Sequence, residues 1–178
     1  YIYSEGHRLE RLSFKLLDLL LLKKDTVTMR PVYLPSLLEE IQQSLVPALK
    51  EKGIQLVCRS DLGSVPLEPD LIKSLLYNLI DNAAKAIEQE GVIALRATLI
   101  PGICQFQLAD TGRGMEAEEL DRITEAFYRV DKARARSQGG AGLGLALCKQ
   151  IVALHNGTIH FSSEPGKGTR VTVNLCVE

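Results

Sequence analysis

Apolar side chains recur along the first 24 residues at a spacing that predicts one long helix. Ile2, Leu9 and Leu16 lie seven positions apart, and further leucines follow the last two at a distance of three. Apolar residues at the a and d positions of a seven-residue repeat are typical of a coiled coil or a four-helix bundle. The leucine run 19–22 widens this stripe. The helix therefore packs either against more than one neighbouring helix or back onto the chain's own core.

The rest of the chain alternates between helix-like and strand-like patterns. We expect helices over residues 35–52, 70–90, 116–127 and 143–155, and strands over 54–59, 92–99, 103–109, 158–163 and 169–177. Residues 25–30 form a linker, and the turn-rich connection 61–69 has room for another short strand. Hairpin strands with helices grouped between them indicate an α+β fold, a two-layer α/β sandwich with one sheet under one layer of helices.

Composition excludes several classes of protein. Of the 178 residues, 46% are apolar and 24% are charged, which argues against a disordered tail, a collagen-like repeat or a membrane bundle. The formal net charge is -1, so no general basic field attracts nucleic acid, and an anionic ligand must be captured locally. The chain starts without methionine and has no signal peptide, so we expect a piece cut from a longer protein.

Cysteine and histidine are too scattered for a zinc site. Cys58, Cys104, Cys148 and Cys176 form no C-x-x-C pair, and only three histidines are present. Three of the cysteines lie in apolar stretches, where we expect buried, reduced thiols and a reducing compartment.

Three glycine clusters are the first sign of a ligand site. Residues 110–115 (D-T-G-R-G-M) follow a predicted strand, residues 139–145 (G-G-A-G-L-G-L) open a predicted helix, and residues 166–169 (G-K-G-T) form a turn. Glycine lets the backbone approach a ligand, and a helix N-terminus offers free N–H groups to phosphates. The P-loop motif is absent. The G-x-G-x-x-A string 112–117 lacks the second parallel strand that a dinucleotide-binding fold needs, because a polar loop takes that place.

One face of the helix predicted over 70–90 is polar in an apolar setting. Asn78, Asn82 and Lys85 are spaced i, i+4 and i+7, so they share one face among leucines and isoleucines. Amides and an ammonium group are unfavourable to bury without partners. A carboxamide oxygen can bind Mg²⁺ and a lysine can bind phosphate, so this face is a candidate ligand site.

Five short sequence motifs, taken in their order along the chain, resemble those of a known family. They are N-L-I-D-N-A-A-K (78–85), D-T-G-R-G-M (110–115), E-A-F-Y-R-V-D (125–131), G-A-G-L-G-L-A-L-C-K (140–149) and G-K-G-T (166–169). Residues 31–178 thereby resemble the catalytic ATP-binding domain of sensor histidine kinases, in the GHKL superfamily. The resemblance implies a Bergerat-type fold, a mixed sheet under about three helices. Residues 1–24 resemble the second helix of that family's dimerisation and histidine-phosphotransfer hairpin.

The resemblance also implies roles for single residues. Asn82 would bind Mg²⁺, with Asn78 supporting the same site and Lys85 contacting phosphate. Asp110 would accept a hydrogen bond from the adenine amino group. The other residues expected to bind ATP are Gly112, Gly114, Met115 and Thr169 near the base, and Phe127, Arg129, Gly140, Gly142, Leu143 and Gly144 at the lid and the phosphates. Residues 128–139 would form a mobile lid, in which Arg134, Arg136 and Gln138 are further candidates for phosphate contacts.

Two positions depart from the family's pattern. Ala86 stands where the family often has an aromatic residue that stacks near the nucleotide, which would lower nucleotide affinity. Asn78 stands where ATP-hydrolysing relatives have a glutamate that activates water, which favours phosphoryl transfer over hydrolysis. The phosphorylated histidine would precede residue 1, because His7 lacks its sequence context. We expect His155 and His160 to be structural.

The expected function is therefore transfer of the ATP γ-phosphoryl group to a histidine upstream of residue 1. The expected partners are the protein's own phosphotransfer hairpin, a response regulator and a second copy bound through the N-terminal helix, with no nucleic acid. The expected location is the cytoplasmic side, with the parent protein anchored in a membrane. Two alternatives stay open at this point, a GHKL serine kinase of the anti-sigma type and a degenerate nucleotide-sensing module without activity.

Overall fold

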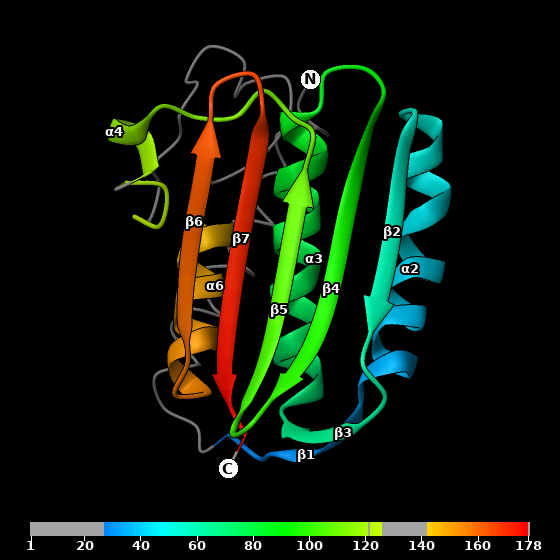
Figure 1. Cartoon of the computed structure of the whole chain (residues 1–178), viewed down its shortest axis with the longest axis vertical. Coiled ribbons are helices and arrows are strands. Elements are labelled where there is room, and N and C mark those ends of the chain that lie inside the picture. The colour runs from blue at the N-terminus through cyan, green and yellow to red at the C-terminus, as the bar shows by residue number, and fades with distance from the viewer. Residues whose placement is uncertain (1–26, 121, 126–141, 178) are drawn as a thin grey trace, which may run out of the picture.

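A twisted five-stranded sheet forms the centre of the computed structural model, which describes residues 27–120, 122–125 and 142–177. The strands lie in the order β2-β4-β5-β7-β6 (Figure 1). Their bounds are β2 Ile54–Ser60, β4 Gly91–Ile100, β5 Ile103–Asp110, β6 Thr158–Glu164 and β7 Gly168–Cys176. Only β2 and β4 pair in parallel and the other pairs are antiparallel, so the sheet is mixed, as expected.

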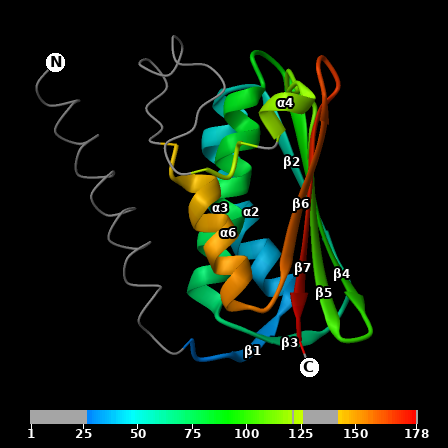
Figure 2. The same ribbon diagram turned by 90° about the vertical axis from the view of Figure 1, so that its left-hand side faces the viewer.

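Three helices cover one face of this sheet. They are α2 (Leu34–Glu51), α3 (Pro69–Ala86) and α6 (Gly144–Leu154), which lie together on the same side in Figure 2. Between the two layers the core is apolar, with Leu75, Leu76, Ile93 and Phe106 almost fully buried. The structure therefore confirms the two-layer α+β sandwich predicted from the sequence.

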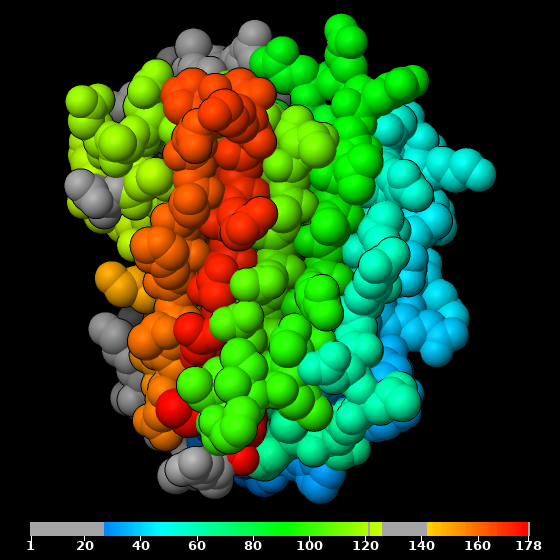
Figure 3. Space-filling view, in the orientation of Figure 1, coloured from blue at the N-terminus to red at the C-terminus, as the bar shows by residue number. Residues whose placement is uncertain are grey.

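The other face of the sheet is open. Along β4 and β5 the outward positions include polar residues such as Arg96, Gln105 and Gln107, whereas the inward positions are apolar except for Asp110 at the end of β5. Gln105 donates a hydrogen bond to Asn174 across the β5–β7 pair, at 2.8 Å. The strands run side by side across this uncovered face in the space-filling view (Figure 3). This alternation is typical of an antiparallel sheet that has one face packed on the core and the other exposed to solvent.

A second, two-stranded sheet lies at the opposite end of the molecule from the β6–β7 turn (Figure 1). Strand β1 (Arg30–Tyr33) pairs antiparallel with β3 (Ser64–Leu67). Strand β3 fulfils the expectation of a short strand between residues 61 and 69. Strand β1 begins at the last residue of the expected linker 25–30, whose position as a boundary stays a prediction.

A buried histidine fastens α3 to α6. His155 follows the last residue of α6 and is 1% exposed. Its Nε2 accepts a hydrogen bond from the backbone N–H of Glu68 at 3.2 Å, so the ring proton lies on Nδ1, which donates to the Ile151 carbonyl at 2.8 Å. The Glu68 carboxylate in turn caps α3 by accepting from the Leu71 N–H at 2.6 Å. His155 is thus structural, as expected, whereas His160 points from β6 toward the open face and is exposed.

Two predicted helices are longer than the ones observed. Helix α3 ends at Ala86, four residues before the expected end at residue 90, because Ile87 is extended and the Ala86 carbonyl accepts from the Arg113 N–H. The expected helix 116–127 is, within the described residues, the single turn α4 (Ala117–Leu120), followed by a turn at residues 122–125. The bonds from Arg122 to Glu119 and from Glu125 to Arg122 span three residues, as in tight turns, and the bond from Ile123 to Glu119 spans four.

The predicted N-terminal helix, residues 1–24, and the whole of the predicted lid, residues 128–139, lie outside the described residues. Among the helices of the described part of the chain, none is long and apolar enough to cross a membrane.

Candidate functional site

The carboxylate of Asp110 ends strand β5 inside the protein. The residue is 8% exposed, and its Oδ1 accepts hydrogen bonds from the backbone N–H of Gly112 at 2.8 Å and of Thr169 at 3.3 Å. Both bonds end on the same oxygen. Neither of these bonds within the described residues uses the other oxygen, Oδ2, so the adenine-binding role predicted for Asp110 would use that oxygen.

Burial changes the acidity of this carboxyl. Desolvation raises the pKa of Asp110 above its usual value, and the N–H groups of Gly112 and Thr169 lower it again in part. Both donors come from backbone, so they add no charge of their own. The carboxyl group of Asp110 is thus hydrogen-bonded by neutral donors, an environment suited to a neutral, hydrogen-bonding base.

The glycines after β5 let the chain pack against itself. A β-carbon on Gly112 would lie 2.8 Å from both the β-carbon and the carbonyl oxygen of Ala86. Gly114 has a positive φ of 70°, and a β-carbon there would collide with the carbonyl oxygen of Glu164. Two predicted site glycines therefore serve first to bring the loop 112–115 against the end of α3 and against β6.

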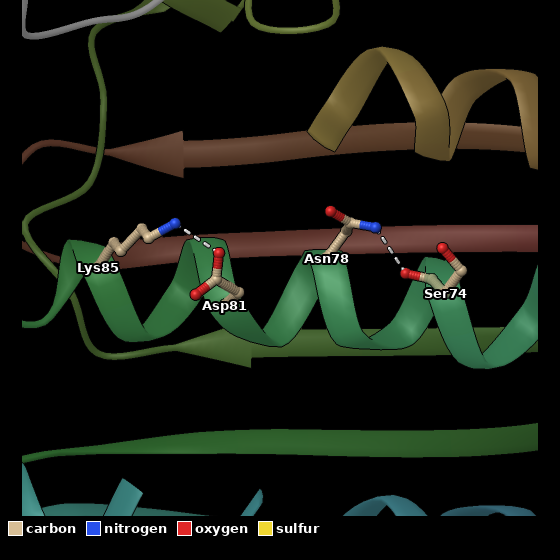
Figure 4. A network of polar contacts seen from close by, with 4 residues as sticks. All are labelled: Ser74, Asn78, Asp81 and Lys85. Atoms are coloured by element: carbon tan, nitrogen blue, oxygen red, sulfur yellow. Dashed lines mark hydrogen bonds and ion pairs between the residues drawn. The ribbon is translucent and has the colours of Figure 1, made fainter. Parts of the chain in front are cut away.

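Asn78 and Asn82 occupy successive turns of α3. Asn78 is buried, and its side-chain nitrogen donates to the Ser74 carbonyl at 2.7 Å (Figure 4). Its side-chain oxygen faces Gly144, where a β-carbon would lie at 3.0 Å. Asn82 differs, because its Nδ2 is buried and has no hydrogen-bond partner among the described residues. An unpaired buried donor is unfavourable in a folded protein, so Asn82 marks a place where a ligand acceptor fits.

Lys85, the third member of the predicted face, pairs within its own helix. Its Nζ forms an ion pair with Oδ2 of Asp81, four residues earlier, and both side chains are partly exposed (Figure 4). The sequence analysis overlooked this partner. A phosphate that bound Lys85 would compete with Asp81 for the ammonium group, so the predicted role of Lys85 involves an exchange of partners.

The N-terminus of α6 lies beside Asn78. Leu143 occupies the N-cap position without a side-chain cap, and the helix begins at Gly144, which contacts Asn78. The first N–H groups of a helix have no partner within the helix, so they are available to an anion. Gly142 just before it has a positive φ of 70°. Phe127, Arg129, Gly140 and the lid candidates Arg134, Arg136 and Gln138 lie outside the described residues.

The residues present fit a divalent cation only in combination with a ligand. No group of three His, Cys, Asp or Glu side chains that could hold a metal occurs among residues 27–120, 122–125 and 142–177. Mg²⁺ commonly keeps only one or two protein oxygen ligands and takes the others from phosphates and water. The carboxamide oxygen of Asn82 suits that role, while its unpaired nitrogen suits a phosphate oxygen.

Sequence reasoning missed one polar residue of the site, Ser163. Its hydroxyl accepts a hydrogen bond from the Met115 N–H at 2.9 Å and contacts the Thr169 hydroxyl at 3.0 Å. It thereby connects two of the predicted site residues. The alternation of β6 predicts that residue 163 faces the helices, but it does not reveal the bond to Met115, which comes from a distant loop.

Comparison with known proteins places this geometry in context. Residues 67–178 match the family described as histidine kinase-, DNA gyrase B- and HSP90-like ATPase. The circadian input-output histidine kinase CikA of Synechococcus elongatus is 33% identical over 97% of this chain, which spans 24% of that relative. The sensor protein SrrB of Staphylococcus aureus is 30% identical over 98% of this chain, which spans 30% of SrrB. The chain therefore spans about a quarter to a third of the length of these relatives.

Solved structures agree in fold over almost the whole chain. The crystal structure of full-length ShkA in complex with AMPPNP superposes with a TM-score of 0.86 and 27% identity, covering 98% of this chain and 37% of ShkA. The Acinetobacter baumannii histidine kinase AdeS superposes with a TM-score of 0.82 over 99% of this chain and 82% of AdeS. At 19% identity, AdeS is a likeness of fold alone.

Proposed function

This chain belongs to the histidine kinase-, DNA gyrase B- and HSP90-like ATPase family, and from that membership we propose that it is the ATP-binding catalytic part of a sensor histidine kinase. It would bind Mg·ATP and transfer the γ-phosphoryl group to a histidine on a phosphotransfer hairpin. From there the phosphoryl group would pass to an aspartate of a response regulator.

The proposal rests mainly on one observation. Two side chains that can each hydrogen-bond a ligand, those of Asn82 and Asp110, lie near the end of α3 and at the end of β5. Asp110 keeps Oδ2 for a ligand, and Asn82 keeps a buried nitrogen without a partner among the described residues. Asn82 lies one turn, about 6 Å, before Ala86. The Ala86 carbonyl accepts from the Arg113 N–H at 3.0 Å, which fastens the end of α3 to the loop after Asp110.

Each of these groups has a chemical role toward ATP. Asp110 accepts from the exocyclic amino group of adenine, which guanine lacks at that position. Asn82 donates to a phosphate oxygen through Nδ2 and offers its carboxamide oxygen to Mg²⁺. When bound, Mg²⁺ neutralises charge on the phosphates. The first N–H groups of α6 and the glycines before it support the phosphates from the other side.

The proposal favours transfer over hydrolysis. Hydrolysis needs a group that orients or deprotonates water, and the position one turn before Asn82 holds Asn78, an amide that donates to the Ser74 carbonyl. Transfer to a histidine needs mainly positioning and charge stabilisation. The acceptor histidine would lie on the hairpin whose second helix is residues 1–24, joined through residues 25–30 to the catalytic domain 31–178. That helix would also form the homodimer, on the cytoplasmic side of a membrane.

The test uses the whole chain with Mg·ATP and a separately supplied phosphotransfer hairpin. Isothermal titration is expected to show binding of Mg·ATP, and radiolabelled ATP is expected to label the hairpin. The label should be lost in acid, because phosphohistidine is acid-labile, whereas phosphoserine from a serine kinase would survive. No binding at millimolar nucleotide would rule out both kinds of kinase. Binding without any transfer to the hairpin would favour a nucleotide-sensing module.

A further inference from the structure

Two segments distant in sequence meet at the base end of the site, the loop 110–115 and the turn 163–169. Gly166 donates its backbone N–H to the Arg113 carbonyl at 2.7 Å, and Thr169 donates its N–H to Asp110 at 3.3 Å. The side chain of Ser163 adds a further bond between the two segments, because its hydroxyl accepts from the Met115 N–H at 2.9 Å. Ser163 is therefore a residue whose side chain, in addition to these two backbone donors, sets the relative position of the two segments.

The hydroxyl of Ser163 uses its full hydrogen-bonding capacity. A serine hydroxyl has one proton and can accept two hydrogen bonds. It accepts from the Met115 N–H at 2.9 Å, and it lies 2.9 Å from the Gly168 carbonyl, which can only accept. The single Ser163 proton therefore goes to Gly168. The remaining contact, 3.0 Å to the Thr169 hydroxyl, then has Thr169 as the donor.

This assignment fixes the polarity of Thr169. Its backbone N–H is used on Asp110 and its hydroxyl proton on Ser163, so the free capacity of its hydroxyl is for accepting only. Asp110, beside it, also offers only an acceptor through Oδ2. An amino group at position 6 of a purine can donate a hydrogen bond to these acceptors. A carbonyl oxygen at position 6 is itself an acceptor and can form no hydrogen bond with them.

We propose that Ser163 is a positioning residue that sets the base selectivity of this site, by holding Met115 and Thr169 in place and by consuming the Thr169 hydroxyl proton. This inference rests on the proposed function, since it requires a nucleotide at Asp110. Ser163 acts through Thr169 and Asp110 and does not itself need to touch the base. A merely structural role would predict something different, an equal loss of affinity for every nucleotide.

The experiment compares ATP with ITP, which carries a carbonyl oxygen in place of the 6-amino group. Dissociation constants of the Mg complexes are measured by titration of the full chain, for wild type, Ser163→Ala and Ser162→Ala. Ser162 is the matched control, because it neighbours Ser163 on β6 but points to the open face. We expect Ser163→Ala to lower ATP affinity about tenfold and to lower ITP affinity much less, because the freed Thr169 hydroxyl proton can then be donated to the 6-carbonyl oxygen of ITP. Ser162→Ala should behave as wild type for both nucleotides.

A double-mutant cycle with Thr169→Val tests whether Ser163 acts through the Thr169 hydroxyl. If Ser163 acts through the Thr169 hydroxyl, Ser163→Ala should change the ATP-to-ITP ratio much less in the Thr169→Val background than in wild type. Equal losses for ATP and ITP, no loss at all, or full additivity in the cycle would each overturn the inference. These outcomes leave the proposed function standing as long as the wild type binds ATP. A wild-type chain that binds neither nucleotide would remove the inference together with the proposed function.

Discussion

Gly168, the first residue of β7, packs with its backbone directly against the backbone of Asp110, the last residue of β5. A β-carbon on Gly168 would collide with the carbonyl oxygen of Asp110. Gly168 also has a positive φ of 88°. The next residue, Thr169, donates its N–H to the Asp110 carboxylate. The close approach at Gly168 therefore brings that donor within reach of the acid expected to read the base.

Replacing Gly168 by alanine should destabilise the domain strongly. We expect Gly168→Ala to lower the free energy of unfolding by about 2–4 kcal/mol, because the methyl group meets rigid backbone and φ is unfavourable for alanine. The control is Gly166→Ala, in the same turn, with a φ of 76° and nothing within 4 Å of its β-carbon. Strain at φ alone should cost about 1 kcal/mol there. Urea denaturation measures both, and equal losses would contradict the collision.

Asp110→Asn should separate ligand binding from stability. The amide keeps an oxygen for the N–H groups of Gly112 and Thr169, so the loop retains its bonds. The second position now carries an NH₂ group, which cannot accept from the amino group of adenine, so we expect ATP affinity to fall at least about tenfold. Titration with Mg·ATP measures the loss. An unfolded Asp110→Asn protein would show that the residue is structural.

The same variant should be more stable than wild type at neutral pH. Burial raises the pKa of Asp110 in the folded protein, so the folded state holds the proton more tightly than the unfolded chain, where the pKa is about 3.9. Wild-type stability therefore falls as pH rises from about 4 through the raised pKa, and Asp110→Asn escapes this loss. Thermal melts should show a higher melting temperature for the variant at pH 7 and a smaller difference at pH 4. A difference independent of pH would contradict this account.

Asn82→Asp should abolish nucleotide binding without unfolding the domain. The change removes the unpaired donor of Asn82 and places a negative charge where phosphates are expected, so we predict a loss of ATP affinity of at least about tenfold. Asn174→Asp is the matched control, because it makes the same chemical change on β7 and the open face of the sheet. Nucleotide titration and circular dichroism check both variants. Unchanged ATP affinity in Asn82→Asp would remove Asn82 from the site.

The two histidines near the end of α6 should respond very differently to mutation. His155→Ala should lower the free energy of unfolding by about 2–4 kcal/mol, because it leaves a cavity and deprives the Glu68 N–H of its acceptor. His160→Ala, on the exposed face, should change it by less than about 0.5 kcal/mol. Chemical denaturation of both variants measures these values. Similar losses would show that the hydrogen bond between α3 and α6 contributes little.

Thiol labelling should follow burial and acidity. Desolvation raises the pKa of Cys58 to about 11 and that of Cys104 to about 12, so neither forms the reactive thiolate to a useful extent at pH 8. Cys176 is exposed, and iodoacetamide should modify it first. Cys104 and Cys148, both buried, should react only after urea is added. Mass spectrometry follows the reaction, and Cys176→Ser should remove its fast phase. Rapid native labelling of Cys104 would contradict the burial.

Local patterns predicted most of the strands and helices. The hairpin of β4 and β5 was located to within one residue, because Pro101 and Gly102 form a turn that also sets the register Ile100 opposite Ile103. The start of α3 after Glu68 followed from Pro69 in the same way. Sequence analysis overextended α3 because the bond that uses the Ala86 carbonyl comes from Arg113, far along the chain.

In the candidate site, too, residues within a local motif were predicted, whereas a residue whose role depends on a distant segment was not. Asp110 and the glycines around it were identified from their motif, and the structure brings Asp110, Gly112 and Thr169 together. Ser163 was missed, because a single serine in a strand gains its meaning only from the loop that packs on it. The partner of Lys85 is four residues away, but a helical ion pair and a phosphate ligand look alike in a sequence.

The position of β7 between β5 and β6 makes the proposed nucleotide site depend on the last strand of the sheet along the chain. Gly168 and Thr169 begin this strand, which follows the other four strands of the sheet along the chain, yet it occupies the interior of the sheet and not an edge. A chain that ends before β7 lacks the strand between β5 and β6. It also lacks Gly168 and Thr169, which contact Asp110. Binding of nucleotide would therefore report that the whole sheet, β7 included, has folded.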